Sequence, residues 1–312
     1  MKIKTSGDAV NIFEPELREL KQNLLKTVKA LSHDIGERNV YDNPKLEAAR
    51  KYIAGEFRRC GYTPAEQTYR LNTEFTHINM IDCANIAAEL KGSRKPEEII
   101  IIGAHYDTLY GTPGADDNAS GVAGLLELAR LASKAGPYSK TVRFVAFANE
   151  EPPFFKTPNM GSTVYAKQLK KDKANVKAMI CLEMIGYYSG AEKSQRYPLP
   201  VLKLFYPSKA DFVSIVGNFS SFGLVSKTRS AFRKHSKFRV ESITMFTYVP
   251  GIDFSDQYSF WKEGYKAVMV SDTAFYRNPN YHGASDTYDT LDYQKMAETV
   301  KGLHYVIYEL AQ

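Results

Sequence analysis

The pattern of apolar and polar residues divides the chain into alternating helices and strands. Apolar residues that recur every three or four positions predict amphipathic helices at residues 15–33, 44–60, 120–135, 163–171, 254–263 and 292–310. Short runs of apolar residues predict strands at residues 66–71, 84–90, 99–102, 141–148, 176–182 and 266–271. Strands that alternate with helices in this way are typical of a largely parallel sheet that is covered on both faces.

The segment at residues 187–251 interrupts this alternation. It is rich in aromatic residues and prolines, and only its stretch at residues 210–222 has a helical pattern. We interpret the segment as an excursion from the sheet that shapes a binding pocket, and not as a separate domain. The whole chain, residues 1–312, is therefore expected to form a single α/β domain.

Composition and charge exclude several classes of protein. The chain has 312 residues, of which 44% are hydrophobic and 24% are charged, and these are ordinary values for a globular protein. The net charge of +6 is mild and spread along the chain, so no nucleic-acid partner is expected. No apolar run approaches the ~18 residues of a membrane span. The first residues lack the apolar core of a signal peptide, so we expect a cytoplasmic protein, or a secreted or periplasmic one if the chain was trimmed.

Polar side chains gather where several of the predicted strands end. They are His105 with Asp107, Asp117, Glu150 with Glu151, Glu183, and His282. Because the carboxyl ends of parallel strands meet at one edge of a sheet, we expect these side chains to lie close together. Two imidazoles and three carboxylates could hold two metal ions with one carboxylate bridging them. Zinc suits this mixture of ligands, and manganese or cobalt would also be accommodated. A pair of such ions can polarise a carbonyl group and generate hydroxide at neutral pH.

Two pairs of residues that lie close together in the sequence suggest different roles for members of this cluster. Glu150 and Glu151 are adjacent, so on an extended backbone their side chains point in opposite directions. One glutamate can bind metal while the other stays free to transfer a proton. Asp107 is expected to hydrogen-bond the far ring nitrogen of His105 and thereby fix its tautomer.

The same residues lie in five short motifs that together resemble family twenty-eight of the metallopeptidases. In chain order the motifs are His105-x-Asp107, the run GADDNASG at residues 114–121, Asn149-Glu150-Glu151, Leu182-Glu183-Met184, and His282-x-x-x-Asp286-Thr287. The resemblance extends from about Asn43 to the end of the chain. This family includes bacterial leucyl aminopeptidase, aminopeptidase Y and glutamate carboxypeptidase.

The resemblance implies a fold, a metal site and a reaction. The fold is a three-layer α/β sandwich with a mixed, mostly parallel sheet of about eight strands between helices. The implied ligands of two zinc ions are His105, Asp117, Glu151, Glu183 and His282, with Asp117 bridging the ions and Glu150 acting as the general base. The expected enzyme is an exopeptidase in which metal-bound hydroxide attacks the terminal peptide bond. We expect an aminopeptidase whose substrates are peptides with a free terminus.

Two departures from the family pattern concern the surroundings of the metals. Position 183 is Asp in the best-known aminopeptidases, whereas Glu183 is one methylene longer. The run at residues 152–155, Pro-Pro-Phe-Phe, replaces a small turn and predicts a stiff aromatic wall. Met184 and Tyr281 flank presumed ligands, and we expect them either to line the substrate pocket or to pack in the core.

Three alternative functions remain at this point. A carboxypeptidase on the same fold needs a cation for the substrate carboxylate, which one of six basic residues could supply: Lys227, Arg229, Arg233, Lys234, Lys237 and Arg239. A glutaminyl cyclase resembles a one-zinc version of this site, and the intact GADDNASG run argues against it. A binding protein without activity would be expected to have lost some of the ligands. No oligomeric state is predicted.

Overall fold

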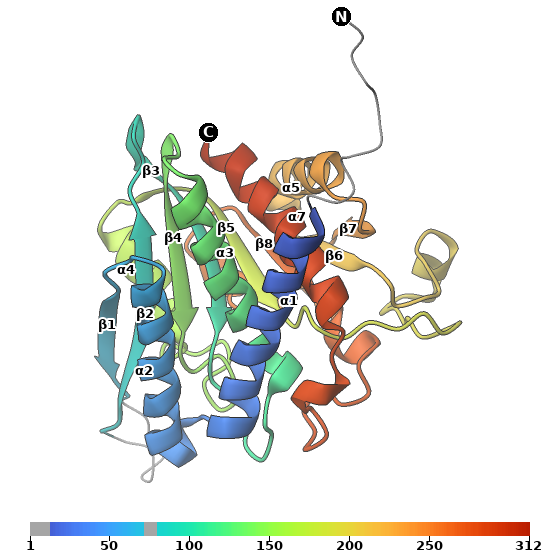
Figure 1. Cartoon of the computed structure of the whole chain (residues 1–312), viewed down its shortest axis with the longest axis horizontal. Helices are drawn as coiled ribbons and strands as arrows, with labels where there is room; N and C mark the ends of the chain where they lie inside the picture. The colour runs from blue at the N-terminus through green and yellow to red at the C-terminus, as the bar shows by residue number, and fades with distance from the viewer. Residues whose placement is uncertain (1–12, 72–79) are drawn as a thin grey trace, which may run out of the picture.

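The fold is known from a computed structural model, which describes residues 13–71 and 80–312 (Figure 1). The strands are β1 (Ala65–Arg70), β2 (Asp82–Leu90), β3 (Lys95–His105), β4 (Lys140–Phe147), β5 (Asn175–Glu183), β6 (Val213–Gly217), β7 (Val240–Thr244) and β8 (Ala267–Ser271). The helices are α1 (Phe13–Lys29), α2 (Asn43–Arg59), α3 (Gly121–Ala135), α4 (Gly161–Lys171), α5 (Phe222–His235), α6 (Gln257–Lys262) and α7 (Tyr293–Ala311).

The strands form one 8-stranded mixed sheet in the order β1-β2-β4-β3-β5-β8-β6-β7. Its central strands β4, β3, β5 and β8 are parallel to one another. The β1–β2, β2–β4 and β6–β8 pairs are antiparallel, and β7 runs parallel to β6. The predicted class, an α/β sandwich with a mixed and mostly parallel sheet of about eight strands, is confirmed. The parallel centre brings the carboxyl ends of four strands to the same edge.

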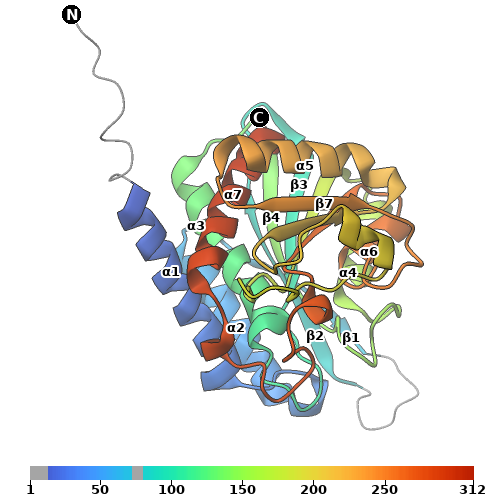
Figure 2. The same cartoon turned by 90° about the vertical axis from the view of Figure 1, so that its right-hand side faces the viewer.

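Helices cover both faces of the sheet (Figures 1 and 2). Along β3, Ile100 and Ile102 belong to the core beneath α1, α2, α3, α5 and α7, and Ile99 and Ile101 belong to the core beneath α4 and α6. The strand is therefore apolar on both faces, as its unbroken run of isoleucines predicts. Full burial of each such side chain contributes about 1.5–3 kcal/mol, which fixes the strand from which the site projects.

The prediction for residues 210–222 is wrong. This stretch is not a helix but forms strand β6, and helix α5 begins only at Phe222. Val213 and Ile215 are buried, and β-branched residues at alternating positions favour a strand over a helix. Part of the segment at residues 187–251 thus joins the sheet as β6 and β7 instead of leaving it.

Strand β7 forms one edge of the sheet, and its outward-facing carbonyl groups are partly capped. The Tyr206 hydroxyl donates a hydrogen bond of 2.9 Å to the Ser242 carbonyl oxygen, and Arg233 donates one of 3.1 Å to the Val240 carbonyl oxygen. Capping an edge strand in this way opposes pairing with another chain. It also ties the loop that carries Tyr206 to the sheet.

Two further expectations can be compared with the structure. The helix expected at residues 254–263 is shorter and covers Gln257–Lys262, because Ser255 and Asp256 turn into the interior, where both are fully buried. Among the described residues, no helix is both long and apolar enough to cross a membrane. The first twelve residues, on which the expectation about compartment depends, lie outside the described part of the chain.

Candidate metal centre and its pocket

Five side chains from distant parts of the chain meet at the carboxyl edge of the sheet in two groups of potential metal ligands. The first group is His105, Asp117 and Glu183, and the second is Asp117, Glu151 and His282. In each group the ligand atoms lie within 4.8 Å of one another. Asp117 belongs to both groups, so its carboxylate could bridge two ions.

In each group the Nε2 atom of the histidine lies within 3.5 Å of an oxygen of both carboxylates. The Nε2 atom of His105 lies 3.3 Å from Asp117 Oδ1 and 3.3 Å from Glu183 Oε2. The Nε2 atom of His282 lies 3.2 Å from Asp117 Oδ2 and 3.5 Å from Glu151 Oε2. The two oxygens of Asp117 therefore face different groups.

Two observations indicate that this cluster fits metal ions. Each group combines two carboxylates with one imidazole, so it carries a negative charge that burial makes costly unless a cation balances it. Glu151 is 4% exposed, and its Oε1 atom is buried without a hydrogen-bond partner. Imidazole nitrogen and carboxylate oxygen are donors that zinc accepts at a two-ion site.

The electrostatics of the site give Glu150 and Asp117 different properties. Burial raises the pKa of the Glu150 carboxyl well above its ordinary value, and the nearby acids Glu183 and Asp256 act in the same direction. Burial would also raise the pKa of Asp117, but hydrogen bonds with His105 and His282 outweigh it and hold that pKa below its usual value. Burial and the neighbouring carboxylates thus disfavour the charged form of Glu150, whereas the two imidazoles favour the charged form of Asp117.

The contacts of Asp107 differ from the hydrogen bond to His105 that the sequence led us to expect. Its carboxylate lies 3.5 Å from His105 Nδ1, so this contact is electrostatic and not a short hydrogen bond. The two oxygens of Asp107 instead accept hydrogen bonds of 3.0 Å from the backbone N–H groups of Glu150 and Glu151. Asp107 therefore fixes the loop that carries both glutamates.

Asp286 holds the loop of the shared ligand in the same manner. Its two carboxylate oxygens accept hydrogen bonds of 2.9 and 3.1 Å from the backbone N–H groups of Asp116 and Asp117. The side chain of Asn118 then joins this loop to the end of β5, because it donates to the Leu182 carbonyl and accepts from the Met184 N–H. These bonds set the position of Asp117 relative to Glu183.

Replacing Asp107 with asparagine is expected to lower kcat/KM about 10–100-fold, a typical cost for losing a residue that orients metal ligands. An asparagine side chain presents one acceptor and one donor, so one of the two backbone N–H groups loses its partner. Because Asp107 is 2% exposed, we also expect a loss of about 1–3 kcal/mol in the free energy of unfolding. Steady-state kinetics and thermal denaturation measure the two effects.

The control for this prediction is Asp172→Asn, the same change at an exposed residue directly after α4. This variant is expected to leave kcat/KM and the free energy of unfolding unchanged. Activity of the Asp107 variant equal to that of the wild type would contradict the role given to this carboxylate.

Sequence reasoning missed two residues that support the site. Ser255, which precedes α6 by two residues, donates a hydrogen bond of 2.5 Å to Glu183 Oε2. Arg38 is fully buried and donates to the backbone carbonyls of Tyr106, Pro113 and Gly114, which connects the end of β3 to the loop of Asp117. Neither residue lies in a recognisable motif, since each acts through a backbone or side-chain contact that only the fold creates.

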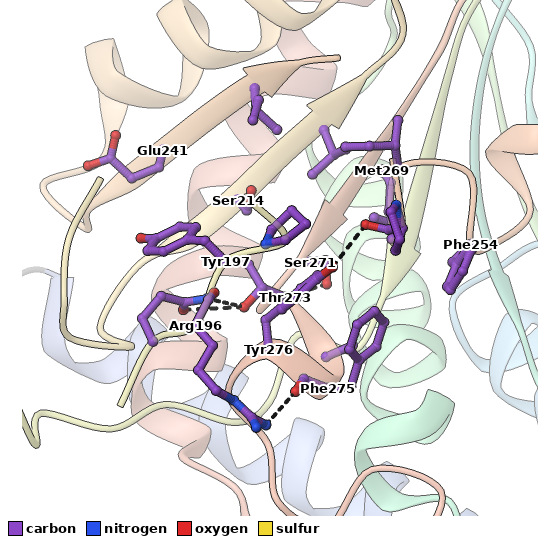
Figure 3. Close-up of a pocket in the computed structure, with 18 of the residues that line it drawn as sticks. Arg196, Tyr197, Ser214, Glu241, Phe254, Met269, Ser271, Thr273, Phe275 and Tyr276 are labelled. Carbon is purple, nitrogen blue, oxygen red and sulfur yellow. Dashed lines mark hydrogen bonds between the residues drawn. The ribbon is translucent and has the colours of Figure 1, made fainter. Parts of the chain in front are cut away.

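A cavity opens beside the candidate metal centre (Figure 3). Its floor is a row of residues in register across four strands: Glu183 on β5, Ser271 on β8, Ser214 on β6 and Glu241 on β7. Residues in register point to the same face, and neighbouring strands lie about 4.8 Å apart, so this row extends about 14 Å from the metal centre. A second row, consisting of Met269, Val216 and Ile243, makes the floor largely apolar.

Aromatic residues line the remaining sides of the cavity. Tyr197 and Tyr206 come from the segment at residues 187–251, and Phe275 and Tyr276 come from the loop after β8. Tyr281 also lines the cavity, and its ring stacks on His282 with 3.8 Å between ring centroids. The cavity therefore adjoins the second ligand group directly.

Of the two places expected for Met184, the pocket wall or the core, the structure shows the core. Met184 is fully buried and is not one of the residues that line the cavity. From the run at residues 152–155, Phe155 reaches the cavity indirectly, since its ring packs at 6.1 Å against Phe254, which lines the cavity. None of the six basic residues at 227–239 lines the cavity; its arginine is Arg196.

Comparisons with known proteins agree with this geometry. The sequence profile of peptidase family M28 matches residues 85–307, which confirms the resemblance inferred from the five motifs. The chain is 41% identical to Escherichia coli (strain K12) uncharacterized protein YfbL, over 92% of this chain and 87% of that protein. It is 30% identical to a probable leucine aminopeptidase of Trichophyton verrucosum, over 72% of this chain but only 56% of that protein.

Solved structures share the fold at low sequence identity. The zinc aminopeptidase BSAP of Bacillus subtilis superimposes with a TM-score of 0.74 and 16% identity, over 94% of this chain and 95% of that one. A glutaminyl cyclase of Fimbriiglobus ruber superimposes with a TM-score of 0.70 and 20% identity, over 93% and 95%. Because both enzyme types have this fold, the fold alone does not separate their activities.

Proposed function

The chain belongs to peptidase family M28, and on this basis we propose that it is a zinc-dependent aminopeptidase. The observation that carries the proposal is the pair of ligand groups that share Asp117. In the proposed site two zinc ions are held by His105, Asp117, Glu151, Glu183 and His282. The name of the Trichophyton verrucosum relative, a probable leucine aminopeptidase, supports the choice of reaction.

In this proposal the chain's own residues provide orientation and proton transfer. Zinc bound at the site would supply Lewis-acid polarisation of the scissile carbonyl and would make water more acidic. Glu150 takes a proton from the attacking water on a carboxylate oxygen and then delivers it to the nitrogen of the leaving amine. The raised pKa of Glu150 suits a group that must hold this proton between the two steps. Asp107 keeps Glu150 in place through its backbone N–H.

The cavity is the proposed binding site for the side chain of the residue that is released. Its floor of Met269, Val216 and Ile243 favours an apolar side chain, and Tyr281 lies where the cavity meets the metal centre. The segment at residues 187–251 contributes both to the floor and to the walls, so we propose that it determines specificity. The free amine of the substrate is expected to lie near a metal ion or a spare carboxylate.

The alternatives have less support. A one-zinc cyclase needs only one group of ligands, whereas this chain has two complete groups. The carboxypeptidase alternative depended on one of the six basic residues within 227–239, and none of the six lines the cavity; Arg233 and Arg239 instead lie within 4.0 Å of the Glu241 carboxylate. Arg196 does line the cavity, so the substrates that the protein cleaves decide this alternative.

The proposal predicts a specific pattern of activity. With zinc present, the protein should cleave leucyl and phenylalanyl p-nitroanilides, and acetylation of the substrate amine should abolish cleavage. Glycyl and glutamyl substrates should react more slowly, since each buried methylene group contributes about 0.8 kcal/mol, or nearly fourfold in kcat/KM. A chelator should remove the activity, and added zinc should restore it.

Cleavage of acetylated peptides from their carboxyl end would instead identify a carboxypeptidase. Cyclisation of N-terminal glutamine without any peptide cleavage would identify the cyclase. Either result would contradict the proposed function.

A further inference from the structure

One wall of the cavity is a short loop with a strained backbone. The chain after β8 supplies four consecutive residues of this wall, at positions 273–276. Thr273 and Ala274 have φ angles of 86° and 48°, a left-handed conformation that β-branched residues in particular rarely adopt. Figure 3 shows Thr273, Phe275 and Tyr276 together on one side of the cavity. Such a backbone persists only where surrounding contacts hold it in place.

Arg277, the next residue, makes these contacts from behind the wall. It is 5% exposed and is not one of the described residues that line the cavity. Its Nε donates hydrogen bonds of 3.1 Å to Thr273 Oγ1 and 3.0 Å to Gln195 Oε1. The Gln195 amide in turn donates a hydrogen bond of 2.9 Å to Thr273 Oγ1. The strained threonine is therefore held by two side chains that also bind each other.

The other end of the Arg277 guanidinium reaches the floor of the cavity. Its Nη1 donates a hydrogen bond of 2.8 Å to the carbonyl of Phe212, the residue immediately before β6. The guanidinium carbon also lies 4.6 Å from the centroid of the Phe212 ring. Strand β6 supplies Ser214 and Val216 of the floor. Arg277 thus links the wall to the floor, although it belongs to neither group of candidate metal ligands.

The separation of wall and floor matters most for a large side chain. An apolar side chain in the cavity would contact the floor at Val216 and the wall at Phe275. The released residue of a glycyl substrate has no side chain to make these contacts. A displaced wall would therefore weaken the reaction of a leucyl substrate and leave that of a glycyl substrate nearly unchanged.

We propose that Arg277 is a positioning residue that sets the specificity of the pocket. It acts through Thr273 and Gln195, which hold the wall at residues 273–276 at the distance from β6 that suits a large apolar side chain. The inference rests on the proposed aminopeptidase function. It adds a determinant of specificity that lies outside the segment at residues 187–251.

The test compares the kcat/KM values of leucyl and glycyl p-nitroanilide as a ratio. A variant that only folds less well contains less active enzyme, which lowers both values equally and leaves the ratio unchanged. Arg277→Lys keeps the charge that the carboxylates of Asp272 and Asp116 attract. A lysine ammonium group lacks the planar fork with which the guanidinium reaches its separate acceptors.

The control is Arg143→Lys, the same change in a different part of the fold. Arg143 lies on β4, forms an ion pair with Glu89, and is not one of the described residues that line the cavity. This variant should keep the leucyl-to-glycyl ratio of the wild type.

We expect Arg277→Lys to lower the leucyl-to-glycyl ratio about tenfold, through a higher KM for the leucyl substrate. This is the effect of losing the contacts of about two methylene groups, each of which contributes nearly fourfold. The kinetics of the glycyl substrate should stay within about twofold of the wild type, and the bound zinc should be unchanged. An unchanged ratio, whether or not the activity as a whole falls, would overturn the inference.

If Arg277→Lys does not fold, two variants of Thr273 decide the question. Thr273→Val removes the hydroxyl group at nearly the same shape and should lower the ratio, whereas Thr273→Ser keeps the hydroxyl group and should preserve it. An added methyl group in an apolar cavity would by itself favour leucine, so the direction of the change separates the two effects. A ratio that Thr273→Val leaves unchanged or raises would overturn the inference.

A measurement without substrate separates this inference from the proposed function. If the wild type cleaves no free-amine substrate, the proposed function fails, and hydrogen exchange of the amides at residues 273–276 decides whether Arg277 holds the wall. Faster exchange in Arg277→Lys or Thr273→Val than in the wild type would support that role. Equal exchange would overturn it.

Discussion

Replacing Glu150 with glutamine is expected to lower kcat about 10²–10⁴-fold, the usual contribution of a general acid–base group. Glutamine has nearly the same shape but cannot accept and return a proton. Glu150 belongs to neither group of candidate ligands, so the variant should bind as much zinc as the wild type. Its fold should also persist, because the backbone N–H that Asp107 holds is unchanged. Activity assays and metal analysis of the same sample measure kcat and the amount of bound zinc.

Glu151→Gln is the matched control for this result. It makes the same chemical change at the adjacent residue, whose carboxylate lies 3.5 Å from His282 within the second ligand group. This variant should lose metal from that group, and added zinc should restore part of its activity. If Glu150→Gln kept full activity, or lost metal as Glu151→Gln is expected to, the division of roles between the two glutamates would be wrong.

Replacing Asp117 with asparagine is expected to lower activity by more than about 10³-fold and to reduce the bound zinc at both sites. Asp117 is the only residue that belongs to both ligand groups among the described residues. Asparagine removes a negative charge and offers one oxygen in place of two, so the two ions would lose their common ligand. Metal ions contribute several kcal/mol to such a reaction, and 4.1 kcal/mol corresponds to about a thousandfold in rate.

Asp116→Asn tests whether the effect is specific to the bridging position. Asp116 is the adjacent residue and is also fully buried, but its carboxylate accepts hydrogen bonds from Gly186 N–H and the Asn278 amide and belongs to neither ligand group. Burial raises the pKa of the Asp116 carboxyl well above its usual value, and the neighbouring Asp272 acts in the same direction. The control should keep its zinc. Two zinc ions retained by Asp117→Asn would contradict the bridging role.

The meeting of the candidate ligands could be predicted from sequence because most of them lie at or near strand ends. His105 and Glu183 are the last residues of β3 and β5, and Glu150 follows the end of β4 by three residues. Apolar runs identify these strands, and parallel strands bring their carboxyl ends together. The five motifs then supplied Asp117 and His282, which lie in loops that have no periodic pattern. The sheet itself was predictable for the same reason, since β3, β4 and β5 are buried runs of apolar residues.

The cavity could not be predicted, because its floor depends on register between strands that are far apart in sequence. Ser214 contributes to the floor only because β6 pairs with β8, and the sequence pattern favoured a helix at that position. Arg196 lies in a loop whose position is set by hydrogen bonds to Phe275 and Tyr276. Asp107 was identified as part of the site, but its bonds to two backbone N–H groups required the loop geometry.

The central claim is that two metal ions at the shared Asp117 site drive hydrolysis next to a free amine. It is tested most directly by adding zinc stepwise to metal-free protein while bound zinc and leucyl p-nitroanilide cleavage are measured together. The account predicts that activity reaches its maximum when two zinc ions are bound per chain, and that Asp117→Asn shows neither saturation nor activity. Full activity with one bound zinc ion, or two bound ions without cleavage of any free-amine substrate, would contradict it.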